Sequence, residues 1–329
     1  MRKKTILAIG ELLIDETIIL KTPFVLGQKI EDERVITTPG GSATNAAIFL
    51  NNLGYNVYLF TSLGRDREGY WAKNLLEKLK IDLTLTPQSR TQKNIVLIDK
   101  KTNTRTIIKD SLSAKKIILT KKLKEIIQKA DLIYLDRHQN HVFDFLLTYK
   151  KPQTEIIFDP STSPSSRNLI ILKQINFPII PWEFLLNWLP GLDFSQTAER
   201  LINFFKKPVI ITLDYWGSLL LDLNHQQFFP SYQIAKSGTN GAGDIFRAAF
   251  SHCLLEKINL KKAIDWCNRI VAVQYLKKGI DRYRFNFQLT RDLSLTKNLF
   301  TFKDFIKSYN QIQYDQSANK DNRRPMFDQ

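Results

Sequence analysis

Short apolar segments alternate with amphipathic helical segments along most of this chain. Residues 5–10, 56–61 and 131–136 have the length and apolar character of buried strands, whereas residues 67–79 and 244–257 carry apolar residues at helical spacing. Strands that alternate with helices are typical of a parallel sheet with both faces covered. The pattern therefore predicts an α/β fold of three layers, α/β/α, with a mostly parallel central sheet.

Two regions break this alternation. Residues 12–38 mix polar and apolar residues with turn signals, and residues 94–109 are typical of a hairpin because apolar runs flank a turn-rich centre. We expect these two regions to form a small accessory sheet. Residues 311–329 lack apolar periodicity, so we predict a disordered tail after a folded domain of residues 1–310.

The composition excludes several classes of protein. With 43% hydrophobic and 24% charged residues, the chain is not generally disordered. Two cysteines, Cys253 and Cys267, are too few for a disulfide framework, which favours a cytoplasmic location. No run of about 18 apolar residues is present, so we expect no membrane span. The net charge of +16 is spread along the chain without a known reader motif, so we expect no nucleic-acid partner.

The sharpest local signal is a glycine-rich loop that opens an apolar helix, Thr239-Asn240-Gly241-Ala242-Gly243-Asp244. Glycines let backbone N–H groups approach an anion, and the helix N-terminus adds partial positive charge. Asp244 could cap the helix or, beside a substrate hydroxyl, act as a general base. Loop and base together suit phosphoryl transfer, which depends on positioning and charge stabilisation. No Gly-Lys-Ser/Thr follows, so this is not a Walker A motif.

Two other clusters could bind a ligand. Gly40 and Gly41 precede a predicted helix, and Asn45 offers both a donor and an acceptor in its first turn, which suits a ligand with several hydroxyls. The same residues could instead form only a tight turn and a cap. Glu11 and Asp15 follow the first strand, and ligands of open α/β sheets bind beyond the carboxyl ends of strands. These acids could bind sugar hydroxyls or be solvated loop residues.

Together, these motifs resemble those of the ribokinase-like (PfkB) carbohydrate kinases. The matching segments are GELLID from Gly10, GGSATNAAIFLNNLG from Gly40, SLGRDREG from Ser62 and TNGAGDIFRAAF from Thr239. The resemblance implies a ribokinase-like α/β/α domain with a small β-sheet lid, made of the pieces near 12–38 and 94–109. It also implies an ATP-dependent transferase that phosphorylates a hydroxyl, expected to be primary, of a small sugar or sugar derivative.

The resemblance assigns a role to each motif. Asp244 would accept the proton of the attacking hydroxyl, and the backbone of Gly241, Ala242 and Gly243 would form the anion hole for the transferred phosphoryl group. The substrate side would comprise Asp15, Gly40, Gly41, Asn45, Arg105, Asp136 and Arg137. The nucleotide side would comprise Thr212, Gly217, Thr239 and Asn240. Mg²⁺ would accompany ATP, held mostly by water and phosphate oxygens.

Three positions on the nucleotide side depart from the family pattern. Gly238 stands where the family usually has an Asp that helps to bind a monovalent cation, which argues against activation by potassium. Asp214 replaces a glycine and would put negative charge near the phosphates. The Asn-x-x-Glu motif that organises Mg²⁺ waters is not intact near residues 181–185, although Glu183 could substitute through water. Residues 134–141 are similar to ketohexokinases, which also vary at that motif.

These departures leave alternatives to an active sugar kinase. The chain could be a sugar-binding protein of the same fold with weakened catalysis, which would bind sugar without releasing ADP. It could also be a nucleoside kinase, because those enzymes share the loop and the base. The expected partners are a small-molecule sugar and ATP, and a homodimer that pairs exposed lid edges is also open.

Overall fold

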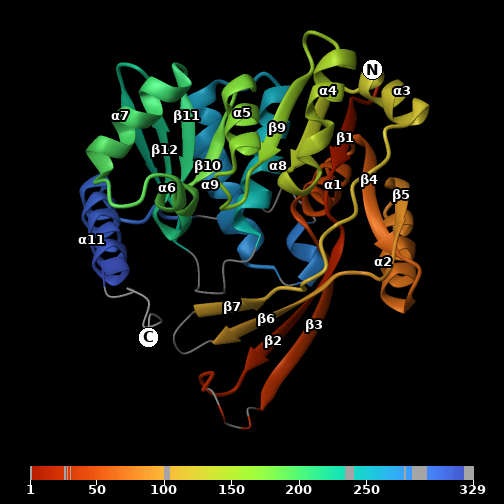
Figure 1. Ribbon diagram of the computed structural model, residues 1–329, viewed down its shortest axis with the longest axis horizontal. Helices are drawn as coiled ribbons and strands as arrows, with labels where there is room; N and C mark the ends of the chain where they lie inside the picture. Colours follow the sequence, from red (N-terminus) through yellow and green to blue (C-terminus); the bar gives the residue numbers. More distant parts are fainter. Residues whose placement is uncertain are drawn as a thin grey trace, which may run out of the picture.

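A parallel sheet of five strands forms the centre of the molecule (Figure 1). The computed structural model describes residues 2–25, 27, 29, 31–99, 104–233, 241–277, 279–283 and 295–321. The strands lie in the order β5-β4-β1-β8-β9, and every neighbouring pair is parallel. Their bounds are Thr5–Ile9 for β1, Asn56–Gly64 for β4, Asp82–Gln88 for β5, Leu132–Asp136 for β8 and Glu155–Asp159 for β9. The predicted mostly parallel central sheet is confirmed.

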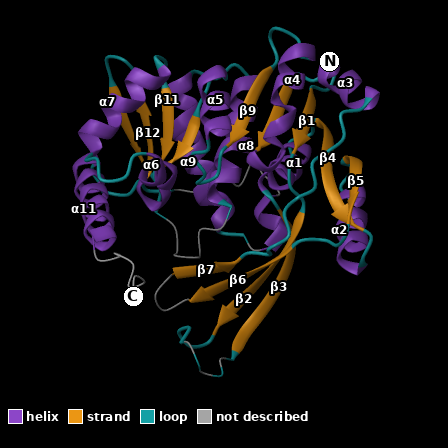
Figure 2. Ribbon diagram, in the orientation of Figure 1, coloured by secondary structure: helices purple, strands orange, loops and turns teal. Residues whose placement is uncertain are grey.

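Four more strands extend this layer beyond β9. They are β10 (Ile179–Pro181), β11 (Val209–Thr212), β12 (Gly217–Leu221) and β13 (Gln226–Pro230), paired in that order. The β10–β11 pair is parallel, whereas the β11–β12 and β12–β13 pairs are antiparallel. Figure 2 shows this group next to β9. The central layer is therefore longer than its purely parallel part.

Helices cover both faces of the layer. Alternate residues of a strand point to opposite sides, so strands that are apolar throughout present apolar side chains on both faces. In β1, Ile6 and Ala8 belong to one core, and Leu7 and Ile9 belong to the other. The first core includes residues of α1 (Ser42–Asn52), α2 (Arg67–Lys78), α8 (Ala242–Leu255) and α9 (Leu260–Tyr275). The second includes residues of α3 (Lys121–Lys129), α4 (Phe143–Tyr149), α5 (Ser166–Gln174), α6 (Trp182–Trp188), α7 (Phe194–Phe205) and α11 (Phe302–Asp321). This is the predicted three-layer arrangement.

A separate four-stranded sheet, which we call the small sheet, begins directly after β1. Its order is β3 (Asp32–Gly40), β2 (Leu13–Leu20), β6 (Lys93–Asp99) and β7 (Thr104–Ile108). β2 is antiparallel to β3 and parallel to β6, and β6 and β7 form the expected antiparallel hairpin. The two regions that break the βα alternation therefore pair with each other. Figure 1 shows the small sheet apart from the central layer, below it in this view.

Helix α11 continues through Asp321, whereas the sequence predicted disorder from residue 311. Phe305 and Tyr309 of this helix are fully buried in the second core, and Gln313 Nε2 donates a hydrogen bond to the Leu189 carbonyl (3.1 Å). These contacts anchor a helix whose later turns lack an apolar pattern of their own. Residues 322–329 lie outside the described part. Within the described residues, no helix combines the length and apolarity needed to cross a bilayer.

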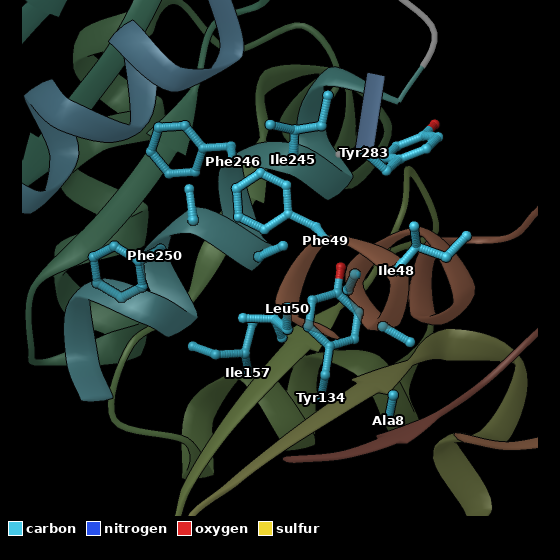
Figure 3. Close-up of a cluster of buried hydrophobic side chains, with 14 of the residues drawn as sticks. Ala8, Ile48, Phe49, Leu50, Tyr134, Ile157, Ile245, Phe246, Phe250 and Tyr283 are labelled. Atoms are coloured by element: carbon cyan, nitrogen blue, oxygen red, sulfur yellow. The ribbon is translucent and has the colours of Figure 1, made fainter. Parts of the chain in front are cut away.

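The packing of α1 against α8 connects the fold to the glycine-rich loops. Figure 3 shows Phe49 of α1 beside Phe246 of α8, and Leu50 and Phe250 belong to the same cluster, with all four side chains buried in the first core. Because each helix begins directly after a glycine-rich segment, this packing also fixes where the two helix N-termini lie relative to each other.

We expect Leu50→Ala to lower the free energy of unfolding by about 2–5 kcal/mol, because it leaves a cavity between α1 and α8. Leu299→Ala is the matched control, since Leu299 is 90% exposed, and it should change stability by less than about 0.5 kcal/mol. Urea unfolding of the two variants measures the difference. Equal losses would contradict the packing described for α1 and α8.

Candidate active site

Two cavities lie at the carboxyl ends of the central strands and share part of their walls. The first, of about 170 Å³, lies between the central layer and the small sheet. The second, of about 290 Å³, is lined from β11, β12, α6, α8 and α9. Both are lined by Asp159, Ser161 and Asp244. Asp244 therefore lies where ligands in the two cavities would meet.

The N-terminus of α8 is open toward the second cavity. Gly241, in a left-handed conformation (φ +85°), is the residue before the helix, and no side chain of the described residues caps the first turn. The N–H groups at the start of a helix have no acceptor within it. Gly241, Ala242 and Gly243, the residues predicted to form an anion hole, line the second cavity. This arrangement suits an anion bound at the helix N-terminus.

Asp244 does not act as a helix cap. Its carboxylate oxygen Oδ2 accepts a hydrogen bond from Asn45 Nδ2 at 2.7 Å, across the junction of α1 and α8. Asn45 Oδ1 is buried and has no hydrogen-bond partner in the described residues. Burial, followed by the repulsion of Asp159, raises the pKa of Asp244 to about 6. A carboxylate with that pKa is ionised at neutral pH and can accept a proton.

Asp159 and Arg247 form an ion pair next to Asp244, and sequence reasoning missed both residues. Arg247 Nη2 lies 3.2 Å from Asp159 Oδ1, and the two side chains are only 3% and 8% exposed. Burial alone would raise the pKa of Asp159, but the Arg247 guanidinium and nearby hydrogen bonds hold it below its usual range. The available signals were an acid at the end of a strand and an arginine inside an otherwise apolar helix.

Asp15, Gly41 and Asn45, three of the residues predicted to bind the substrate, line the first cavity. Asn94 Nδ2 of β6 donates to Asp15 Oδ1 (3.2 Å), so two strands of the small sheet contribute to one polar wall. Gly41 has a φ of +99°, and a Cβ there would collide with the Glu11 carbonyl oxygen, so the turn requires glycine. Gly40 ends β3 opposite Leu13, next to the cavity but outside its lining.

Asp136 and Arg137 also line the first cavity, where β8 ends and the short helix η1 (Arg137–Val142) begins. Asp136 is buried and accepts hydrogen bonds from the backbone N–H groups of Glu11 (2.7 Å) and His138 (2.9 Å). Burial raises its pKa to about 7. Asp136 thus holds together the loops that follow β1 and β8. His138 Nε2 lies 3.4 Å from Glu11 Oε2, which also lines the cavity.

Thr212 and Gly217, predicted to bind the nucleotide, line the second cavity together with Glu183, predicted to act on Mg²⁺ through water. Asp214, in the short helix η2 (Asp214–Trp216), lines it as well and has a left-handed φ of +52°, a conformation that favours glycine. In the described part of the chain, no group of three or more His, Cys, Asp or Glu residues could hold a metal ion. An ion held mainly by phosphate and water needs no such group.

Some predicted residues cannot be placed fully. Gly238, Thr239 and Asn240 lie outside the described residues. Arg105 belongs to β7, opposite Ile98 of β6, but its side chain is also outside the described part.

The model of the pfkB carbohydrate kinase family matches residues 3–282. The chain is 28% identical over 314 residues to the bifunctional protein HldE of Helicobacter pylori, with 84% of this chain and 64% of HldE covered. It thus spans less than two thirds of that relative. It is 22% identical over 290 residues to ribokinase of Haemophilus influenzae, with 84% of this chain and 94% of the relative covered.

Among solved structures, Arabidopsis thaliana ribokinase complexed with ribose and ATP superposes with a TM-score of 0.70 at 19% identity. The superposition covers 89% of this chain and all of the ribokinase chain. This similarity confirms the predicted ribokinase-like fold.

We expect the partly buried Asp15 carboxyl to make the protein less stable as the pH rises. Burial raises the pKa of Asp15 from 3.8 to about 6. Between about pH 4 and 6 the folded state keeps a proton that the unfolded state has released, so stability falls through that range. The free energy of unfolding of Asp15→Asn, measured relative to that of the wild type, should therefore be higher at pH 7.5 than at pH 4 by on the order of 2 kcal/mol.

Urea unfolding at the two pH values measures this gain. Asp82→Asn is the control because Asp82 is half-exposed at the edge of the central sheet, and the substitution should change stability by less than about 0.5 kcal/mol. The same effect of Asp15→Asn at pH 4 and 7.5 would refute the prediction.

Proposed function

Because the chain belongs to the pfkB family of carbohydrate kinases, we propose that it transfers the γ-phosphoryl group of ATP to a hydroxyl of a small sugar or sugar derivative. The sugar occupies the first cavity, and ATP occupies the second. The observation that carries this proposal is the place of Asp244, on the wall shared by both cavities and at the open N-terminus of α8.

In the proposed reaction, Asp244 accepts the proton of a sugar hydroxyl, expected to be primary. The freed oxygen forms a bond to the γ-phosphorus as the bond to the ADP oxygen breaks, and ADP leaves with that electron pair. The hydrogen bond from Asn45 holds the Asp244 carboxylate in position. With its pKa near 6, Asp244 can exchange this proton close to neutral pH.

The backbone N–H groups of Gly241, Ala242 and Gly243 are proposed to stabilise the charge on the transferred group. Thr212 and Gly217 would line the rest of the triphosphate path, with Thr239 and Asn240 completing the loop. The carboxylate of Glu183 on the same cavity wall fits the water shell of Mg²⁺. The ion would offset negative charge on the phosphates.

The small sheet is proposed to act as a lid within a single kinase domain, which extends past the predicted boundary at residue 310 because α11 continues through Asp321. It contributes Asp15 from β2, Asn94 from β6 and Ile107 from β7 to the first cavity, and Arg105 of β7 would join them. Gly40 at the end of β3 and Gly41 before α1 would complete the sugar site, together with Asp136 and Arg137 where β8 ends. A lid over the bound sugar would exclude water from the site, which limits transfer of the phosphoryl group to water.

One observation favours a second candidate, a sugar-binding protein with weakened catalysis. Four carboxylates line the second cavity, those of Asp159, Glu183, Asp214 and Asp244. Negative charge at Asp214 opposes binding of a triphosphate. The experiments below distinguish the two candidates.

Asp244→Asn should lower kcat by about 10²- to 10⁴-fold, the usual contribution of a general base. The measurement is ADP release with Mg-ATP over a panel of hexoses, pentoses, sugar acids and nucleosides. Asp144→Asn is the matched control, since that carboxylate is exposed on α4, and it should retain full activity.

Undiminished ADP release by Asp244→Asn would refute the assigned base. Sugar-induced thermal stabilisation without ADP release would favour the binding protein. A response only to nucleosides would identify a nucleoside kinase.

Asp214→Gly should lower the KM for ATP by about fivefold, which corresponds to ~1 kcal/mol for one charge a few ångströms from a phosphate in water. Asp214→Asn separates charge from backbone, because it removes the charge and tolerates the left-handed conformation. Steady-state kinetics should show a lower KM in both variants. An unchanged KM in both would show that Asp214 does not oppose the nucleotide.

A further inference from the structure

Arg247 is a buried charge that the proposed mechanism does not use. It lies on α8, one helical turn after Gly243, and its side chain is 3% exposed. Its guanidinium packs under the glycine-rich turn, where a Cβ on Gly243 would lie 2.9 Å from Nη1. The glycine therefore makes room for the arginine as well as for a ligand.

The Arg247 guanidinium has only partial compensation. Nη2 lies 3.2 Å from Asp159 Oδ1 and donates a long hydrogen bond (3.4 Å) to the Ile179 carbonyl. Nε has no hydrogen-bond partner in the described residues. Removing a cation from water costs free energy, and carboxylates close to the cation can offset that cost. The carboxylates around Arg247 therefore decide what this arginine does.

Two of the groups near Arg247 are the carboxylates of Asp159 and Asp244. Asp159, buried at the end of β9, and Asp244, partly buried in the first turn of α8, both interact with Arg247, and these three groups carry a net charge of −1 when ionised. Asp159 is also influenced by Arg137 and Asp136. The other titratable groups that face Asp244 are the phenols of Tyr134 on β8 and Tyr283 on the short helix η3 (Gly279–Tyr283). From α1 it is faced by Asn45 and by the neutral hydroxyl of Ser42.

We propose that Arg247 is a positioning residue for the general base: its ion pair holds Asp159 as a fixed carboxylate and keeps Asp244 ionised where the two cavities meet. This inference rests on the proposed function for the catalytic meaning of Asp244, but not for the electrostatic effect itself. Without the arginine, two carboxylates would face each other in a buried site, and such a pair retains a proton. A proton on Asp244 would remove its capacity as a base.

The effect of each charge on Asp244 can be separated by substitution. Asp159→Asn removes a repelling carboxylate and should lower the pKa of Asp244. Adding Arg247→Met to Asp159→Asn removes the cation as well, and the pKa should rise by about 1 to 3 pH units above that of Asp159→Asn. This comparison isolates Arg247 without leaving Asp159 as an unpaired charge. Arg247→Met alone should give the highest pKa of the series.

The primary measurement is the titration of the Asp244 carboxyl by NMR on full-length protein labelled with ¹³C at aspartate carboxyls, with Asp244→Asn used for assignment. Arg247→Lys retains the charge and should titrate closer to the wild type than Arg247→Met. Where a sugar substrate is found, the acid limb of kcat/KM should shift in the same order, so Arg247→Met should regain activity at high pH. A purely structural role for Arg247 would lower activity equally at every pH.

The proposal is overturned if Asp244 titrates at the same pH, within about half a unit, in Asp159→Asn and in the double variant. It is also overturned if the acid limb stays in place while kcat falls. A titration in the expected order without any ADP release would support the role of Arg247 in setting the charge of Asp244. That same result would count against the kinase, so the two proposals can fail separately.

Discussion

The burial of α1 against α8 over the central sheet is the contact on which the candidate site depends. Phe49 and Leu50 meet Phe246 and Phe250 in a core that excludes water (Figure 3). Since this packing fixes both helices, it also fixes their first turns, and Asn45 can donate to Asp244 across the junction. The polar site is thus positioned by apolar contacts within about the next two turns of each helix.

Acidic side chains gathered at one end of the sheet oppose folding, and the structure compensates for them individually. Asp136 accepts two backbone N–H groups, Asp159 pairs with Arg247, and Asp244 accepts from Asn45. Among the described residues, Asp15 accepts a single hydrogen bond, from Asn94, and burial raises its pKa to about 6. Incomplete compensation is typical of sites that keep polar capacity for a ligand.

Much of the fold could be predicted because its signals are local. Apolar spacing in residues 67–79 or 244–257 reports a helix before any tertiary contact forms. The segment from residue 311 to 321 was harder to predict, because contacts with residues distant in the sequence anchor this helix and its own apolar spacing does not indicate one. In the sequence, Asp244 and Asn45 were equally compatible with helix caps. In the structure their side chains form a hydrogen bond with each other, and neither one caps its own helix.

The sequence by itself determined the order of strands and helices, the two glycine-rich turns and the family, since each of these depends on residues close together along the chain. The tertiary structure alone decided which polar and charged side chains of the site meet. Asn45 and Asp244 are 199 positions apart, and Arg247 meets Asp159 from another element of the fold. The physical reason is that the energy of a charge depends on its burial and on its neighbours in space, and local spacing encodes neither.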